Sequence, residues 1–277
     1  MQEKYREFLV TTPGISKYLN GMILSQETAV YKLENEQSVP EFLAANGILP
    51  GIKVDLGLEK IPNYNNCRTC GLEDLDSRLT KYYNLGLRFT KWRAVFETEK
   101  NQEIPEAVID QNTKDLAKYA KKVLDKNLVP IIEPEVLMGS QDIFTYYNNT
   151  RRVLKSLITN LSDLGVALDC CILKINMIYS KQNQVDETGE MTMKLILETV
   201  PEHIGGIVFL SGGQDEKQST ENLKSIMVKN NGRYRMSFSF GRAIQDSALQ
   251  IWQADDKNLK AAQNKLLDCL KNNCEVL

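Results

Sequence analysis

Lys174 lies within an apolar run, residues 170–177, whose composition is typical of a buried strand. A lysine held among apolar side chains loses hydration, which favours the neutral amine, a usable nucleophile toward carbonyl groups. A single lysine near the end of a strand more often extends its charged group into solvent. Lys174 therefore indicates amine chemistry only if other reactive side chains converge on it.

Other polar side chains end strand-like runs of the sequence at regular intervals. The strand-like runs are residues 21–24, 51–55, 87–93, 128–133, 171–174, 206–211 and 234–239. From Asp55 onward, the polar ends are separated by roughly 30 to 41 residues, which is the length of a strand, a loop, a helix and a return loop. The spacing predicts repeated strand–helix units.

Helical periodicity fills the segments between these runs. Apolar residues recur on one face of a helix that starts near Pro105, of a second that Gly165 stops and of a third that Pro201 ends. The closing stretch from Asp255 has a fourth apolar stripe. Strands that alternate with helices form parallel sheets, and seven or eight such units favour a barrel. No shift of composition divides the chain, so we expect one domain over residues 1–277.

In a barrel of this kind, the side chains at the carboxyl ends of the strands meet on one face. The polar strand ends then form a single group: Asp55, Lys91, Arg93, Glu133, Glu135, Lys174, Ser211 and Arg242. Each of them alone would be interpreted as a solvated residue at the rim. Their arrival at the same rim predicts a functional site.

The composition argues against several classes of protein. The chain has 277 residues, of which 42% are hydrophobic, and a formal net charge of −2 with both signs mixed along the sequence. This balance argues against a nucleic-acid surface or a polybasic membrane patch. No apolar stretch approaches the roughly 18 residues of a membrane span, and the first residues do not resemble a signal peptide. We expect a cytoplasmic protein.

The sequence does not predict a metal site. Cys67 and Cys70 form a lone C-x-x-C pattern in a segment predicted to be a polar loop after residues 63–66, so we expect a structural or incidental role for them. His203 is the only histidine and lies in a predicted loop after Pro201. A catalytic zinc ion requires two or three converging histidine or cysteine ligands.

Six motifs, in order, resemble those of class I fructose-bisphosphate aldolases of the eukaryotic type. They are GIKVD at 51–55, KWR at 91–93, VPIIEPE at 129–135, LK at 173–174, FLSGGQ at 209–214 and SFSFGRA at 237–243. The resemblance covers the chain from about Tyr5 to Leu270. It implies an α/β fold of the (β/α)₈ TIM-barrel type. It also implies reversible cleavage of fructose 1,6-bisphosphate to dihydroxyacetone phosphate and glyceraldehyde 3-phosphate in glycolysis and gluconeogenesis.

The resemblance also implies a role for each matching residue. Lys174 would be the Schiff-base lysine, because a protonated imine accepts electrons from the breaking C–C bond better than a ketone does. Lys91 would lie beside it and favour the neutral amine by charge repulsion. Glu133 would move protons, Glu135 would hold this network in place, and Asp55 completes the catalytic set. The residues implied to bind the sugar bisphosphate are Lys53, Arg93, Ser211, Gly212, Gly213, Ser239, Gly241 and Arg242. The family implies a homotetramer and neither a metal nor a cofactor.

The sequence also departs from the family pattern. Family members carry an extra first strand ending in Ala-Ala-Asp-Glu-Ser before the segment that matches residues 22–24, and this sequence has no counterpart of it. We therefore expect seven strands, with apolar edges exposed beside residues 22–24 and 236–238. We also expect slow cleavage, because the family's aspartate takes part in breaking the C–C bond.

Two functions from different classes stay open. The first is an aldolase with impaired activity. The second is a non-catalytic relative of aldolases that binds a sugar phosphate or a partner protein. The presence of Lys174, Glu133, Lys91 and Arg242 favours the first, since a protein without turnover has no chemical need for all four.

Overall fold

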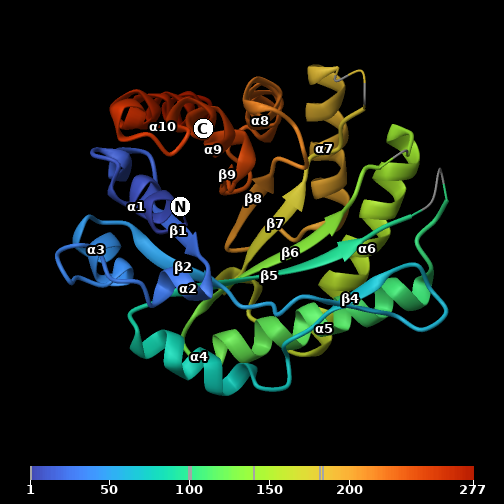
Figure 1. Cartoon of the computed structure of the whole chain (residues 1–277). Coiled ribbons are helices and arrows are strands. Elements are labelled where there is room, and N and C mark those ends of the chain that lie inside the picture. Colours follow the sequence, from blue (N-terminus) through green and yellow to red (C-terminus); the bar gives the residue numbers. More distant parts are fainter. Residues whose placement is uncertain (1, 99–101, 140, 181, 183) are drawn as a thin grey trace.

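A curled parallel sheet surrounded by helices forms the centre of the molecule (Figure 1). The structure is a computed structural model and describes residues 2–98, 102–139, 141–180, 182 and 184–277, with side chains described from residue 4 onward. This arrangement confirms the α/β barrel type that the alternation of strands and helices predicts.

Seven parallel strands form the sheet in the order β1-β2-β5-β6-β7-β8-β9. Their bounds are β1 (Gly21–Leu24), β2 (Leu49–Lys53), β5 (Phe89–Phe96), β6 (Val129–Val136), β7 (Ile172–Asn176), β8 (Gly206–Leu210) and β9 (Met236–Phe238). Strand order follows chain order, so each crossover leads to the adjacent strand, as a barrel requires. The carboxyl ends of all seven strands therefore lie on the same side.

Helices connect successive strands and cover the outer face of the sheet (Figure 1). The α-helices are α1 (Gln2–Thr11), α2 (Gln26–Ala29), α3 (Val39–Ala45), α4 (Leu75–Asn84), α5 (Glu106–Leu124), α6 (Ile143–Asp163), α7 (Val185–Thr199), α8 (Glu216–Asn230), α9 (Arg242–Trp252) and α10 (Leu259–Cys274). Short 3₁₀ helices occupy Ile15–Lys17, Leu168–Cys170 and Asp256–Asn258. None of the described helices combines the length and the apolar character needed to cross a membrane.

Local sequence explains where several helices begin. Ser38 and Glu41 form a capping box at the start of α3, and the side chain of Asp215 accepts a hydrogen bond from the backbone N–H of Gln218 at the start of α8. These bonds satisfy N–H groups that have no partner within a helix. Helix α5 begins directly after Pro105, as the sequence predicts.

The predicted strands are confirmed in order, but their bounds shift. Strand β2 ends at Lys53, so Asp55 lies just beyond it. Strands β5 and β6 extend three residues past the predicted ends because they pair with each other along their whole length, to Phe96 and Val136. Strand β7 also extends further than predicted, which places Lys174 in its middle rather than near its end.

The prediction of a polar loop around Cys67 is wrong. Residues Cys67–Thr69 form β4, which pairs antiparallel with β3 (Leu58–Lys60). The polar residues 63–66, which suggested a loop, lie in the turn of this hairpin, where Asn63 adopts a positive φ of 68°. Because hairpin pairing uses the backbone, the polar side chains did not prevent strand formation.

Strands β1 and β9 are the two edges of the curled sheet. Helix α1 crosses from one edge to the other: the Tyr5 hydroxyl donates to Gln245 Oε1 of α9 at 2.7 Å, and Phe8 stacks on Trp252 with ring centroids 5.3 Å apart. The side chains of both edge strands are buried or half-buried. Met22, Leu24 and Phe238 line a cavity between the two edges, so the expected gap between β1 and β9 is present and α1 does not fill it.

Candidate active site

Strand register brings Lys174, Glu133 and Lys91 to one region of the barrel. Ile132 of β6 pairs with Leu173 of β7, so the next residue on each strand, Glu133 and Lys174, are neighbours. Glu133 pairs with Arg93 of β5, and Lys91 lies two residues before Arg93 on the same strand. Alternate residues of a strand face the same side, so the three side chains point to a common space.

Five charged side chains form a continuous series of ion pairs. Glu133 contacts Lys174 Nζ through Oε1 at 3.1 Å and Lys91 Nζ through Oε2 at 3.0 Å. Asp55 Oδ2 lies 3.7 Å from Lys91 Nζ, and Asp55 Oδ1 lies 2.6 Å from Lys53 Nζ. A proton leaving Lys174 therefore has a carboxylate within direct reach.

The centre of this series is buried. The side chains of Glu133, Lys91 and Lys174 are 5%, 9% and 12% exposed. Charges at this depth persist only when they are paired, because removing an ion from water costs several kcal/mol. The series contains three lysines and two carboxylates, so it has a net positive charge when all five groups are ionised. This excess suits a ligand with negative charge.

Arg93 and Glu135 form a second ion pair beside the first group. Burial lowers the pKa of the Arg93 guanidinium, but the hydrogen bond to Glu135 and the surrounding carboxylate charges outweigh it and leave the pKa raised. The backbone N–H of Arg93 donates to Asp55 Oδ2 at 3.4 Å. Glu135 is therefore joined to the lysine network through Arg93 and Asp55.

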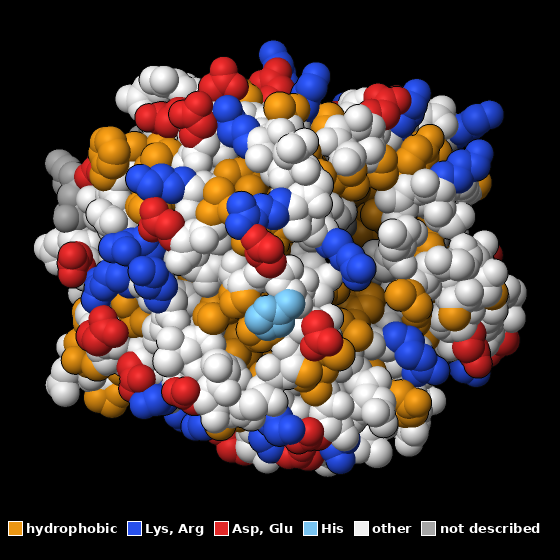
Figure 2. Space-filling view, turned by 180° about the vertical axis from the view of Figure 1, so that it is seen from behind, with side chains coloured by type: hydrophobic (Ala, Val, Ile, Leu, Met, Phe, Trp, Pro, Cys, Tyr) orange, Lys and Arg blue, Asp and Glu red, His pale blue; other side chains and the backbone are white. Residues whose placement is uncertain are grey.

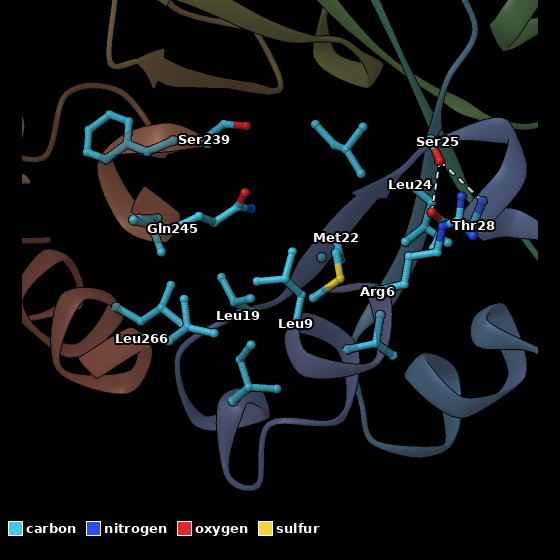
Figure 3. A pocket seen from close by; sticks show the side chains of 18 of the residues that line it. Arg6, Leu9, Leu19, Met22, Leu24, Ser25, Thr28, Ser239, Gln245 and Leu266 are labelled. Carbon is cyan, nitrogen blue, oxygen red and sulfur yellow. Dashed lines mark hydrogen bonds between the residues drawn. The ribbon is translucent and has the colours of Figure 1, made fainter. Parts of the chain in front are cut away.

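A cavity of about 440 Å³ lies beside Lys91 and Lys174, which form part of its wall. The rest of the wall comes from α1 and β1 on one side and from β9, α9 and α10 on the other. Figure 3 shows the labelled side chains, of which Leu9, Leu19, Met22 and Leu266 are apolar and Ser25, Ser239 and Gln245 are polar. Most sites for small ligands are hollows of this kind, apolar with a few convergent polar groups.

The turn after β8 presents backbone N–H groups. Ser211, Gly212 and Gly213 form it, and the two glycines have φ values of +60° and +88°. Successive residues in this conformation aim their N–H groups at a common point and so form a concavity for an anion. A residue with a side chain rarely adopts such φ values, which explains the glycines.

The turn after β9 adds a cation to this edge of the sheet. Gly241 caps α9 and the exposed Arg242 begins it. In the part of the chain that the structure describes, no carboxylate lies within ion-pair distance of Arg242. The backbone N–H of Ser239 donates to the carbonyl of Phe209 at 2.9 Å, which ties this turn to β8. Arg242 is therefore free to bind an anion.

The residues predicted from the sequence fall into two groups. The lysine network and the Arg93–Glu135 pair lie on β5, β6 and β7 and on or just after β2, and the turn residues follow β8 and β9. Ser239 and Gly241 line the same cavity as Lys91 and Lys174, so the two groups meet there. Ser211, Gly212, Gly213 and Arg242 do not line this cavity.

Two residues of this region were missed by the sequence analysis. Ser25 directly follows β1, accepts from the N–H of Thr28 at 3.2 Å and lines the cavity. Its position after a predicted strand was a signal that could have identified it. Tyr179 follows β7 and donates to the carbonyl of Gly212 at 2.8 Å. No pattern in the sequence indicates this contact, because it joins two loops far apart in the chain.

The structure offers no cluster that suits a metal ion among the residues it describes, since no three His, Cys, Asp or Glu side chains converge. His203 lies exposed in a turn, as predicted. Figure 2 shows the face opposite to that of Figure 1, with basic and acidic side chains interspersed and the histidine at the surface. That face lacks a broad surface of one charge.

A curled parallel sheet whose strands alternate with helices places the chain in the class of α/β-barrel proteins, and a buried lysine–glutamate pair lies within the sheet. The chain belongs to the class-I fructose-bisphosphate aldolase family, whose model matches residues 1–276. This confirms the family that the sequence motifs indicated.

Curated relatives support the same assignment. The chain is 41% identical to a probable class 1 fructose-bisphosphate aldolase of Xanthomonas axonopodis pv. citri, over 97% of this chain and 83% of that protein. It is 40% identical to the cytosolic fructose-bisphosphate aldolase 6 of Arabidopsis thaliana, over 98% of this chain and 77% of the relative.

A solved structure has nearly the same fold. It is the fructose-bisphosphate aldolase of Plasmodium falciparum, in a ternary complex with TRAP and a small-molecule inhibitor. It superposes with a TM-score of 0.95 at 35% identity and covers 99% of this chain and 81% of its own.

Proposed function

We propose that the protein is a class I fructose-bisphosphate aldolase that cleaves fructose 1,6-bisphosphate to dihydroxyacetone phosphate and glyceraldehyde 3-phosphate through an imine on Lys174. One observation carries the proposal: Glu133 lies between Lys174 and Lys91, 3.1 and 3.0 Å from their amines, beside a cavity. A nucleophilic amine requires a base within hydrogen-bond reach, and Glu133 meets that requirement.

The geometry supports a sequence of proton and electron transfers. Glu133 accepts the proton that Lys174 must lose before its amine attacks the ketone carbon of the substrate. The same carboxyl group then returns a proton to the carbinolamine oxygen, which leaves as water and forms the imine. The protonated imine takes up the electron pair of the breaking C–C bond and becomes an enamine, while the hydroxyl on the departing carbon loses its proton to solvent and becomes the carbonyl of the aldehyde product. Lys91 supplies positive charge beside this centre.

The two ends of the substrate are assigned to different strand ends. We propose that the phosphate on the ketone half binds at the Ser211–Gly213 turn and Arg242, supported by their free N–H and guanidinium donors. Ser239 and Gly241 would line the path between this turn and Lys174. Lys53 and Arg93 would face the other phosphate, although both are paired with carboxylates in this structure.

We also propose the broader setting of this reaction. The imine mechanism would proceed without a metal or cofactor, in the cytoplasm, and residues 1–277 would form one domain around the single large sheet. The family resemblance further leads us to propose a homotetramer. Light scattering of the purified chain tests this, since a monomeric mass at micromolar concentration would contradict it.

The proposed activity is tested by a coupled assay of fructose 1,6-bisphosphate cleavage with and without EDTA. We expect cleavage that is unaffected by the chelator. Activity that EDTA abolishes and zinc restores would contradict imine chemistry. Tight binding of fructose 1,6-bisphosphate with neither turnover nor an imine would instead identify a non-catalytic sugar-phosphate-binding protein.

A further inference from the structure

Two carbonyl groups of the turn after β8, those of Ser211 and Gly212, accept hydrogen bonds from other residues of the protein. The Ser211 carbonyl accepts from the backbone N–H of Gln214 at 3.0 Å and from Gln214 Nε2 at 2.8 Å. The Gly212 carbonyl accepts from the Tyr179 hydroxyl at 2.8 Å. In a trans peptide the C=O and N–H bonds point in opposite directions. The N–H groups of Gly212 and Gly213 therefore point away from these partners.

Tyr179 controls the direction of one of these two N–H groups. The Gly212 carbonyl and the Gly213 N–H belong to the same peptide plane, and glycine imposes few restrictions on the rotation of that plane. A hydrogen bond that fixes the carbonyl also fixes the opposite N–H. Gln214 does the same for the preceding plane, so two different side chains hold the two donors.

The hydroxyl of Tyr179 is itself well placed for this task. Its ring meets the fully buried ring of Tyr146 edge-on, at 6.2 Å between centroids and 86° between planes. Burial and the negative charge of Glu135 raise the pKa of Tyr179, so its hydroxyl keeps the proton that it donates. Tyr179 follows the strand that carries Lys174, whereas Gly212 follows β8. The bond therefore sets the turn relative to the proposed nucleophile.

We propose that Tyr179 is a positioning residue for anion binding: its hydroxyl orients the Gly212–Gly213 peptide so that the Gly213 N–H donates to the ketone-side phosphate. This inference rests on the proposed function, because it requires a phosphate at this turn. Tyr179 does not enter the chemistry of the imine. Its loss should weaken recognition of the phosphate and leave reaction at Lys174 intact.

The test compares Tyr179→Phe with a matched control, Tyr234→Phe. Tyr234 also donates its hydroxyl to a backbone carbonyl, that of Val200 at 2.9 Å. Val200 precedes β8 and Tyr234 precedes β9, so this bond lies at the opposite end of these strands from the Ser211–Gly213 turn. Both variants lose one tyrosine hydroxyl and one hydrogen bond. Thermal unfolding of both variants separates a loss of stability from a loss of binding.

The readout is the rate of borohydride trapping with dihydroxyacetone phosphate and with dihydroxyacetone, which lacks the phosphate. In Tyr179→Phe we expect the half-saturating concentration of dihydroxyacetone phosphate to rise about fivefold, which is the effect of losing one hydrogen bond. Trapping of dihydroxyacetone should not change. KM for fructose 1,6-bisphosphate should rise by a similar factor with kcat preserved. Tyr234→Phe should change none of these values.

Each outcome has a definite meaning. The role of Tyr179 would be overturned if Tyr179→Phe and the parent protein had the same half-saturating concentration of dihydroxyacetone phosphate. If Arg242→Ala raised that concentration, the phosphate site itself would stay in place. A fall in the trapping of both ketones would also overturn it, because the effect would then lie at Lys174. No preference of the parent protein for the phosphorylated ketone would contradict the proposed phosphate site and this inference together.

Discussion

The charged side chains on β5, β6 and β7 and at the end of β2 differ in kind from the turns after β8 and β9. The first region is a buried series of alternating lysine and carboxylate groups, with Glu133 at 5% exposure. The second consists of glycine turns and an exposed arginine that has no carboxylate partner within the described ranges. Both belong to one sheet, yet only the first contains the paired lysine and carboxylate groups to which we assign proton transfer.

The contrast follows from what each task requires. A covalent intermediate requires a base in contact with the nucleophile and a setting that keeps both in place, which pairing and burial provide. A phosphate requires donors that are not already satisfied, which backbone N–H groups and a free guanidinium provide. Variants on the two sides should therefore affect different kinetic constants.

Lys174→Met should have the largest effect of any single change. It removes the amine that forms the imine, so kcat for fructose 1,6-bisphosphate cleavage should fall at least about 10⁴-fold. The coupled cleavage assay measures it, with Lys155→Met as the control, since Lys155 is exposed on α6. Activity within tenfold of the parent protein would place the nucleophile elsewhere.

Glu133→Gln should have the next largest effect and should also act on kcat. The amide cannot accept the amine proton, so we expect a loss of about 10²- to 10⁴-fold in kcat with little change in KM. The variant also leaves Lys91 and Lys174 without their shared counter-charge, so thermal unfolding should occur at lower temperature. A change confined to KM would show that Glu133 binds substrate rather than moving protons.

Arg242→Ala should act mainly on KM rather than on kcat. It removes a charge-assisted bond to phosphate, and KM for fructose 1,6-bisphosphate should rise about 10- to 100-fold while kcat changes less. Arg235→Ala is the control, because Arg235 is an exposed arginine at the opposite end of β9. Equal effects of the two variants would argue against a specific site at Arg242.

Glu216→Gln should have the smallest effect and should affect stability alone. Burial raises the pKa of Glu216, but hydrogen bonds from Lys265, Cys269 and Ser247 outweigh it and leave the pKa below its ordinary value of 4.5. A lowered folded-state pKa adds stability above the unfolded pKa, and this is lost as the pH falls through the folded value. We expect Glu216→Gln to lower the free energy of unfolding by about 1 kcal/mol at pH 7.

The pH dependence separates this contribution from a packing defect. The difference in unfolding free energy between Glu216→Gln and the parent protein should shrink as the pH falls below 4.5, because Glu216 then becomes protonated in both states. Denaturant titrations at several pH values measure it. A difference that stays constant with pH would show that the ionised carboxylate is not responsible.

The sequence predicted the order of the strands and the grouping of polar residues at one edge, because these depend on local periodicity and on the rule that parallel strands end on one side. It did not predict that Cys67–Thr69 is a strand, since its pairing with β3 depends on the turn between them. Nor did it predict that α1 crosses to α9 or that Tyr179 holds Gly212. Contacts between distant segments carry no local signature.

The central claim is that Lys174 is the residue that forms the imine. It is tested most directly by treating the protein with dihydroxyacetone phosphate and borohydride and mapping the modified peptide by mass spectrometry. We expect the adduct on Lys174 and no adduct in Lys174→Ala. An adduct on Lys53 or Lys91, or continued trapping by Lys174→Ala, would contradict the account.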